Sequence, residues 1–383
     1  MPRLAIVRPS SSILDLDAYN VQELGLGKAL CDLGWNVDLY LRGRVASMTC
    51  GYKHQDQKLR IFSLNGFGLP GQQGIFPEIF NRLNQTAYDL IQVHEDSQVT
   101  SLFCAMWAKN KNVPVILYQG MYEPYSGIKG VFQGCFNALA VPIYKRTLSC
   151  CLSKTTAAKG YLGGLGLSPV HVLPVGLDVT SLEGSLGTEP ESLARFRKRF
   201  QKVLLYVGVF TPRRNPHFLI RLFHELTRTH DVGLVLVGEG PDRESALELA
   251  RKLGVAGRIL AESHVPQNLI SHYYRAADLF LLPSQYEIYG MVLLEALNFG
   301  LPVVSSRTAG AEAILKDESL GILMGTYDLR KWLTVCVSFF DEQQSAKKIR
   351  IAHVREQLSW ETIARKYAEI FQGLGCRSSG SHQ

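Results

Sequence analysis

Long uninterrupted apolar runs are missing from this sequence of 383 residues. No stretch approaches the roughly 20 consecutive apolar residues that a membrane-spanning helix needs. The first apolar run, Leu4–Val7, is also too short for the apolar region of a secretory signal peptide. We therefore expect a cytoplasmic protein, with at most peripheral contact with the inner face of the membrane.

A large excess of one charge and a paired cysteine pattern are missing as well. Lys and Arg number 41 and Asp and Glu 34, and the net charge of +7 is too small for a dedicated nucleic-acid-binding protein. The eight cysteines include no Cys-x-x-Cys pair and no spacing typical of zinc ligands. We expect reduced thiols, no nucleic-acid partner, no metal and no other cofactor.

Short apolar segments alternate with segments of helical periodicity along most of the chain, which predicts βα units around parallel sheets. One helix is expected over Val21–Leu33, ending at Gly34, and another over Ser192–Lys202. The expected strands are Leu4–Val7, Val37–Leu41, Ile61–Leu64, Leu90–Val93, Val115–Tyr118, Cys150–Leu152 and Val170–Leu173, then Val203–Val207, Val232–Val237, Ile259–Ala261, Leu279–Leu282, Val303–Ser305 and Gly321–Met324. A stretch rich in Gly and Ser at 184–190 predicts a linker, so we expect an α/β protein of two doubly wound domains divided near residue 180.

Two glutamates lie where an expected strand gives way to a helix. Glu287 precedes a helix that should begin at Tyr289–Gly290, and Glu295 lies inside that helix with seven residues between the two. Carboxylates can accept hydrogen bonds from sugar diols, and a helix N-terminus favours phosphate. The alternative is a solvent-facing loop glutamate and a helix-surface glutamate.

A second strand is followed by a glycine turn and two arginines. Gly208 ends the strand, and Arg213 and Arg214 precede the next helix. Guanidinium groups bind phosphate in a bidentate manner, although a surface arginine pair is the alternative. Gly238-Glu239-Gly240-Pro241 forms a further turn that lacks the third glycine of a dinucleotide-binding loop.

These stretches resemble the fourth family of retaining nucleotide-sugar glycosyltransferases, also described as glycosyl transferases group 1. The similarity spans about residues 150–365, in the family's order, and it includes Val175-Gly176-Leu177-Asp178, Tyr274-Arg275-Ala276-Ala277-Asp278 and the glutamate string Pro283–Val304. The resemblance implies the GT-B fold, in which two Rossmann-like domains face a cleft. Residues 1–180 would bind the acceptor, residues 181–360 would bind the donor, and a closing helix at about 361–376 would join the first domain.

The resemblance also implies roles for individual residues. Glu287 would contact hydroxyls of the transferred sugar, and Glu295 the ribose of the donor. Arg214 takes the family's lysine position and, with Arg213, would bind the diphosphate, whereas Val209 stands where the family has arginine. The remaining donor-binding positions are Gly208, Gly238, Ile288, Tyr289 and Gly290.

The implied activity is that of a hexosyltransferase acting with retention by front-face substitution, in which the departing diphosphate takes the proton of the acceptor. The expected donor is a nucleoside-diphosphate sugar, with UDP favoured over GDP, and the expected acceptor is a hydroxyl of a glycan or lipid-linked saccharide. Two alternatives stay open: a sugar-nucleotide 2-epimerase of the same fold, and a non-catalytic partner subunit.

The first half of the chain offers acceptor-side candidates. His94 ends a strand and either faces the substrate or is structural, and Gln119-Gly120 aligns with the family's His-Gly string. Asp17 lies in an Asp-x-Asp motif with Asp15 that resembles a metal site of the other glycosyltransferase fold. Basic residues alternate with aromatic ones in the same part of the chain. This pattern fits either contact with a membrane surface or an ordinary solvated helix face. The residues are Lys109, Lys111, Lys129, Lys145 and Arg146, with Phe132, Phe136 and Tyr144.

Overall fold

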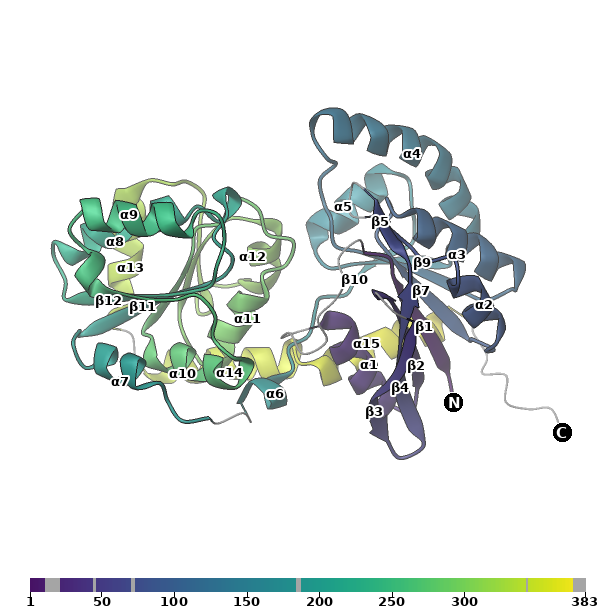
Figure 1. The fold of residues 1–383 in the computed structure, drawn as a ribbon, viewed down its shortest axis with the longest axis horizontal. Helices are drawn as coiled ribbons and strands as arrows, with labels where there is room; N and C mark the ends of the chain where they lie inside the picture. Colours follow the sequence, from purple (N-terminus) through teal and green to yellow (C-terminus); the bar gives the residue numbers. More distant parts are fainter. Residues whose placement is uncertain (11–20, 44–45, 70–72, 184–186, 342–343, 375–383) are drawn as a thin grey trace. The chain divides into compact units, whose positions relative to one another are not determined.

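The chain divides into two units, each with its own wholly or mainly parallel sheet (Figure 1). The computed structural model describes residues 1–10, 21–43, 46–69, 73–183, 187–341 and 344–374. The first unit comprises Met1–Gly176 with Trp360–Gln383, and the second comprises Leu177–Ser359. The C-terminal helix, α15, spans Trp360–Gly373 and belongs to the first unit.

The first unit is built on an eight-stranded sheet with the order β10-β9-β8-β7-β1-β2-β4-β3. Only the β3–β4 pair is antiparallel among these neighbours. The strands are β1 (Arg3–Arg8), β2 (Asn36–Gly43), β3 (Ser47–His54), β4 (Gln57–Asn65), β7 (Leu90–His94), β8 (Val115–Gln119), β9 (Cys150–Ser153) and β10 (Val170–Val172). A separate small sheet pairs β5 (Phe67–Leu69) with β6 (Gln73–Ile75).

Helices cover both faces of this sheet, with α2, α3 and α4 on one side and α1 and α15 on the other (Figure 1). Their bounds are α1 (Gln22–Asp32), α2 (Ile79–Asn84), α3 (Val99–Asn110), α4 (Gly127–Thr147) and α5 (Thr156–Gly164). A Cβ added to Gly25 of α1 would lie 2.0 Å from the indole nitrogen of Trp360. Glycine at this position therefore lets α15 pack directly against α1.

The second unit is built on a six-stranded, fully parallel sheet with the order β13-β12-β11-β14-β15-β16. The strands are β11 (Lys202–Val207), β12 (Val232–Val237), β13 (Ile259–Glu262), β14 (Leu279–Leu282), β15 (Val303–Ser306) and β16 (Gly321–Met324). Every residue of β12 and β14 is buried, as expected for strands covered by helices on both faces.

The helices of the second unit include two short 3-10 turns. Figure 1 shows α8, α9 and α13 on one side of the sheet and α10 and α14 on the other. The bounds are α6 (Val179–Glu183), α7 (Glu191–Arg197), η1 (Pro212–Arg214), α8 (Pro216–Thr227), α9 (Arg243–Lys252), η2 (Ala256–Arg258), α10 (Gln267–Ala276), α11 (Met291–Asn298), α12 (Ala309–Ile314), α13 (Leu329–Ser338) and α14 (Gln344–Gln357).

The α/β architecture expected from the sequence is confirmed, and each expected strand is present. Gly34 follows α1 with φ +89°, as a glycine at C′ should. The helix expected over Ser192–Lys202 is shorter, because α7 ends at Arg197 and Lys202 already begins β11. Within the ranges given above, no helix is both long and apolar enough to cross a bilayer.

Candidate functional site

The candidate site of the second unit lies at the carboxyl ends of neighbouring strands. In the sheet order, β11 lies between β12 and β14, and β15 follows β14. The loops after these parallel strands therefore meet at one edge of the sheet, where ligands bind in open α/β folds. Gly208, Arg213, Arg214, Gly238, Glu287, Ile288, Tyr289 and Gly290 all lie in these loops.

Glu287 is buried in the loop between β14 and α11, with only 5% of its surface exposed. Its carboxylate forms an ion pair with the Arg214 guanidinium of η1. The Glu287 carbonyl oxygen accepts a hydrogen bond of 3.1 Å from the Gly310 N–H at the start of α12. A carboxylate this deeply buried is expected to have a charged partner, and the structure supplies one from a different loop.

Arg214 carries the positive charge at the centre of this edge. Its Nη1 also lies 3.4 Å from the Ser284 hydroxyl, and its buried Nε donates no hydrogen bond within the described part of the chain. Burial, together with the charge of the neighbouring Arg213, lowers the pKa of the Arg214 guanidinium. The Arg213 side chain is exposed, and its carbonyl oxygen accepts a 2.7 Å hydrogen bond from the Gln285 N–H. The η1 turn is thereby tied to the Glu287 loop.

Glu295 lies one turn inside α11 in a different environment. It is 2% exposed and accepts a 2.6 Å hydrogen bond from the hydroxyl of Tyr274 on α10. The Tyr274 ring stacks on Phe299 at 5.5 Å, which fixes its hydroxyl in place. Burial, reinforced by the Glu295 charge, raises the pKa of Tyr274 well above its ordinary value, so this hydroxyl stays a donor.

Two glycines let the loops after β11 and β12 approach closely. A Cβ on Gly238, whose φ is +132°, would lie 2.2 Å from the Gly208 carbonyl oxygen. In the loop between β14 and α11, Gly290 has φ +85° and precedes α11 without a capping side chain. Tyr289 is buried and Ile288 is half-buried. The edge thus combines a buried acid–base pair, backbone turns and an uncapped helix N-terminus, a combination that suits an anion bearing hydroxyl groups.

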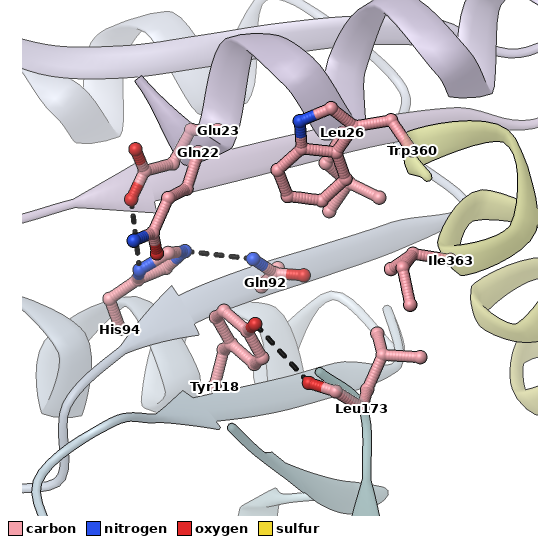
Figure 2. Close-up of a pocket in the computed structure, with 9 residues that line it drawn as sticks. All are labelled: Gln22, Glu23, Leu26, Gln92, His94, Tyr118, Leu173, Trp360 and Ile363. Atoms are coloured by element: carbon pink, nitrogen blue, oxygen red, sulfur yellow. Dashed lines mark hydrogen bonds and ion pairs between the residues drawn. The ribbon is translucent and has the colours of Figure 1, made fainter. Parts of the chain in front are cut away.

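His94, the candidate of the first unit, ends β7 and lines a small pocket (Figure 2). Its Nε2 lies 2.8 Å from Nε2 of Gln92, and its Nδ1 lies 3.5 Å from the carboxylate of Glu23 on α1. Burial lowers the pKa of His94 to about 4, against the opposite effect of Glu23. At neutral pH His94 is therefore an uncharged imidazole. Arg8 of β1 lies 3.1 Å from the same Glu23 carboxylate.

Gln119 and Gly120 lie close to this pocket but have structural partners. The Gln119 amide donates to the Asp96 carboxylate at 3.0 Å and accepts from the Asp96 N–H at 2.9 Å. The Gly120 N–H donates to the Glu95 carboxylate at 3.0 Å. Asp15 and Asp17 lie outside the described residues, and within those residues no three His, Cys, Asp or Glu side chains are grouped as a metal site would require.

Several residues of these two sites were not singled out by the sequence analysis. Ser284 and Tyr274 stood in motifs that the sequence analysis quoted, yet only the structure pairs them with Arg214 and Glu295. Glu23 is one of two acids in the helix expected at Val21–Leu33, and the other, Asp32, lies at its C-terminal end. The partners of Glu23, Arg8 and His94, lie on β1 and β7, so no local sequence spacing predicts these contacts.

Comparison with known proteins adds two findings. Residues 191–352 match the family model described as "Glycosyl transferases group 1". A D-inositol 3-phosphate glycosyltransferase of Xylanimonas cellulosilytica is 28% identical over 221 residues, which cover 55% of this chain and 52% of the relative. The chain spans about half the length of the curated relatives it matches.

Solved structures match over nearly the whole chain at low sequence identity. Sucrose-phosphate synthase of Thermosynechococcus elongatus has a TM-score of 0.75 and 18% identity, covering 99% of this chain and 100% of that one. HepE of Anabaena, solved with UDP and glucose, has a TM-score of 0.69 and 17% identity. The match covers 97% of this chain and 100% of the HepE chain. The fold is accordingly that of the GT-B glycosyltransferases, and residues 191–352, which carry the candidate site of the second unit, are similar to glycosyl transferases group 1.

Proposed function

We propose that this protein is a retaining glycosyltransferase of the hexosyltransferase type. The donor is a nucleoside-diphosphate sugar, UDP rather than GDP, and the acceptor is a hydroxyl of a glycan or lipid-linked saccharide. The buried ion pair of Arg214 and Glu287 beside the N-terminus of α11 carries this proposal. It lies inside the stretch similar to glycosyl transferases group 1, and the HepE structure that shares the fold was solved with UDP and glucose.

The proposed roles follow the chemistry of each group. Arg213 and Arg214 bind the diphosphate, with the N-terminus of α11 adding its partial positive charge. Glu287 contacts hydroxyls of the transferred sugar, and Glu295 the ribose diol. Gly208 and Gly238 allow backbone turns to approach the donor closely.

The proposed reaction proceeds on one face of the sugar. The bond between the anomeric carbon and the phosphate oxygen breaks, and a bond from the acceptor oxygen to the same carbon forms on the same face. The departing diphosphate accepts the proton of the acceptor hydroxyl, while the arginines stabilise its charge. No metal is assigned to this step, so chelation should leave turnover nearly intact.

The first unit is proposed to hold the acceptor, with His94, Gln119, Gly120 and Asp17 as the candidates on that side. His94 is uncharged at neutral pH, so it can act there as a hydrogen-bonding group rather than as a cation. The proposed location is the cytoplasm. The seven cysteines in the described ranges are all free thiols, which suits a reducing compartment.

The test compares Glu287→Gln with Glu295→Gln. Glu295→Gln should weaken binding of both the bare nucleoside diphosphate and the donor, by roughly 10-fold or more for a contact of about 1.5–3 kcal/mol. Glu287→Gln should not weaken binding of the bare nucleotide, because it removes a competitor for Arg214, and it should reduce turnover, because its contact is with the sugar that moves. The matched control is Glu248→Gln on the exposed surface of α9.

Binding is measured by calorimetry with UDP and GDP, and turnover by mass spectrometry of products from a panel of sugar nucleotides and acceptors. Donor converted without any acceptor would indicate the 2-epimerase instead. Nucleotide bound with no turnover of any donor would indicate a non-catalytic subunit. If neither glutamate variant differs from Glu248→Gln in binding or turnover, the donor site lies elsewhere.

A further inference from the structure

The helix α4 has apolar side chains on two opposite sides. One side packs on the unit's core through Ala140 and Tyr144, and the Gln133 amide is buried on the same side. The other side, which we call the α4 stripe, consists of Ile128, Val131, Phe132, Cys135, Ala138, Leu139 and Pro142. At about 100° per residue, the stripe occupies an arc of roughly 120° centred opposite the buried side.

The α4 stripe is strongly exposed. The exposed fractions are 77% for Ile128, 67% for Val131, 71% for Phe132 and 74% for Leu139. Figure 1 shows α4 at the outside of the first unit, with α3 against its inner side. A contiguous apolar surface of this kind on a soluble domain marks a contact with another molecule or with lipid.

The outer side of α9, by contrast, is covered with charge. It carries Glu244, Glu248 and Arg251, which pair with one another in solvent. The α4 stripe has no such pairs, because α4 contains neither Asp nor Glu. The outward sides of α4 and α9 therefore differ in chemistry, one apolar and one charged.

The charges around the α4 stripe are basic. Within α4 they are Lys129, Lys145 and Arg146, and Arg146 lies at the C-terminal end of the stripe itself. Over residues 99–147 there are five basic residues and one acidic residue, a difference of +4. Apolar side chains flanked by Lys and Arg on a helix fit the boundary between lipid headgroups and acyl chains.

We propose that the α4 stripe lies on the surface of a bilayer containing anionic lipids, with Phe132 and Leu139 inserted among the acyl chains and Lys145 and Arg146 contacting headgroup phosphates. Because the opposite side of α4 is packed on the core, the helix would lie in the plane of the membrane surface. Tyr144, which the sequence analysis grouped with the aromatic residues of such a surface, is buried and takes no part. The inference concerns the first unit alone and stands independently of the proposed glycosyl transfer.

Cys135 allows a direct test, since it lies within the α4 stripe and is exposed. The full chain with Cys50→Ser and Cys376→Ser is labelled at Cys135 with an environment-sensitive fluorophore. The matched control keeps Cys50, which is exposed on β3, and carries Cys135→Ser and Cys376→Ser. Vesicles of phosphatidylcholine with 30% phosphatidylglycerol should shift the emission at position 135 to the blue, and that at position 50 should not move.

Unlabelled variants test the side chains in flotation with the same vesicles. Phe132→Glu/Leu139→Glu should lower the partition coefficient at least tenfold, whereas Ile349→Glu, at an exposed apolar position on α14, should leave it unchanged. Lys145→Glu/Arg146→Glu should lower binding to anionic vesicles and reduce its dependence on salt. Circular dichroism and thermal unfolding check that each variant is folded.

Three outcomes would overturn the proposal. The first is absence of vesicle binding by the wild-type chain. The second is equal binding by wild type and Phe132→Glu/Leu139→Glu. The third is that the wild-type chain forms a dimer in vesicle-free solution and that the same double substitution makes it monomeric. The α4 stripe would then be covered by a second copy of this chain.

Discussion

Two carboxylates of the candidate donor site, Glu287 and Glu295, are held by different kinds of partner. Glu287 faces the guanidinium of Arg214, whereas Glu295 accepts from the neutral hydroxyl of Tyr274. A ligand anion that draws Arg214 toward itself would release the Glu287 carboxylate for hydroxyl groups, while Glu295 keeps its donor. Glu287 can therefore exchange its partner when a ligand binds, whereas Glu295 is held in place by Tyr274.

At the same scale, His94 should make the stability of the protein depend on pH. Burial depresses its pKa in the folded state to about 4, below the 6.5 of an unperturbed histidine. As pH falls below about 6.5 the unfolded chain takes up the proton first, so stability present above that pH is lost as pH falls toward 4. Between pH 7.5 and pH 5.0 this one group should cost about 2 kcal/mol.

Urea unfolding at both pH values, for wild type and for His94→Gln, measures this effect. The charged groups around His94 are Glu23 on α1, Arg8 on β1 and Lys154 after β9, and all three are present in both proteins. The difference between the two proteins therefore isolates the imidazole. Equal losses of stability in wild type and variant would show that His94 is not buried as an uncharged group.

At the scale of elements, Gly310 should control the position of the Glu287 loop. A Cβ at Gly310 would lie 2.3 Å from the Tyr289 carbonyl oxygen, and the Gly310 N–H holds the Glu287 carbonyl. Gly310→Ala should therefore displace the loop, lowering the free energy of unfolding by about 1–3 kcal/mol. Under the proposed function it should also weaken donor binding.

Gly325→Ala is the matched control, because nothing lies within 4 Å of a Cβ there. Thermal unfolding and calorimetry with the nucleotide compare the two variants. Should Gly310→Ala behave like Gly325→Ala in both measurements, α12 does not brace the loop.

Most strands that the sequence predicted are short apolar runs, and β3, which it missed, is not. β12 and β14 are short apolar runs buried on both faces, so composition alone identifies them. β3 is exposed along most of its length, and its residues Ser47–His54 form no apolar run. It forms by antiparallel pairing with β4 at the edge of the sheet, which depends on a neighbour rather than on its own side chains.

The candidate sites divide in a similar way. Glu287, Glu295 and Arg214 stand in strings with a recognisable order of strand, loop and helix, so the sequence could nominate them. The charged neighbours of His94 could not be assigned to it from the sequence, because Glu23 and Lys154 are 71 and 60 residues away along the chain (94 − 23 and 154 − 94). Parallel strands bring together side chains from distant segments, and no local pattern records which segments become neighbours.

At the scale of the whole molecule, the two units should differ in whether they fold as fragments. Residues 177–359 contain a complete parallel sheet with its helices. Residues 1–176 lack α15, whose Trp360, Tyr367 and Phe371 are buried in the first unit. Fully burying side chains of this kind contributes about 1.5–3 kcal/mol each.

We therefore expect fragment 177–359 to unfold cooperatively in urea and fragment 1–176 to be unfolded or molten. Joining residues 360–383 to residue 176 should restore a cooperative transition. Circular dichroism and urea titration check all three. A cooperative transition in fragment 1–176 alone would mean that α15 is dispensable for the first unit.

The two ends of the second unit are tied to each other: the Leu177 N–H donates to the Leu358 carbonyl at 2.8 Å, and Leu177 forms a parallel bridge with Ser359. The residues on either side, Gly176 and Trp360, are also in contact, since a Cβ on Gly176 would lie 2.6 Å from the indole of Trp360. In genetic terms, residues 177–359 are an insertion into the first unit, and the two ends of the insertion lie next to each other. Such a segment can be exchanged as a unit: under the proposed function, a gene that replaced it with a relative's equivalent would acquire a new donor preference while keeping the strands of the first unit's sheet.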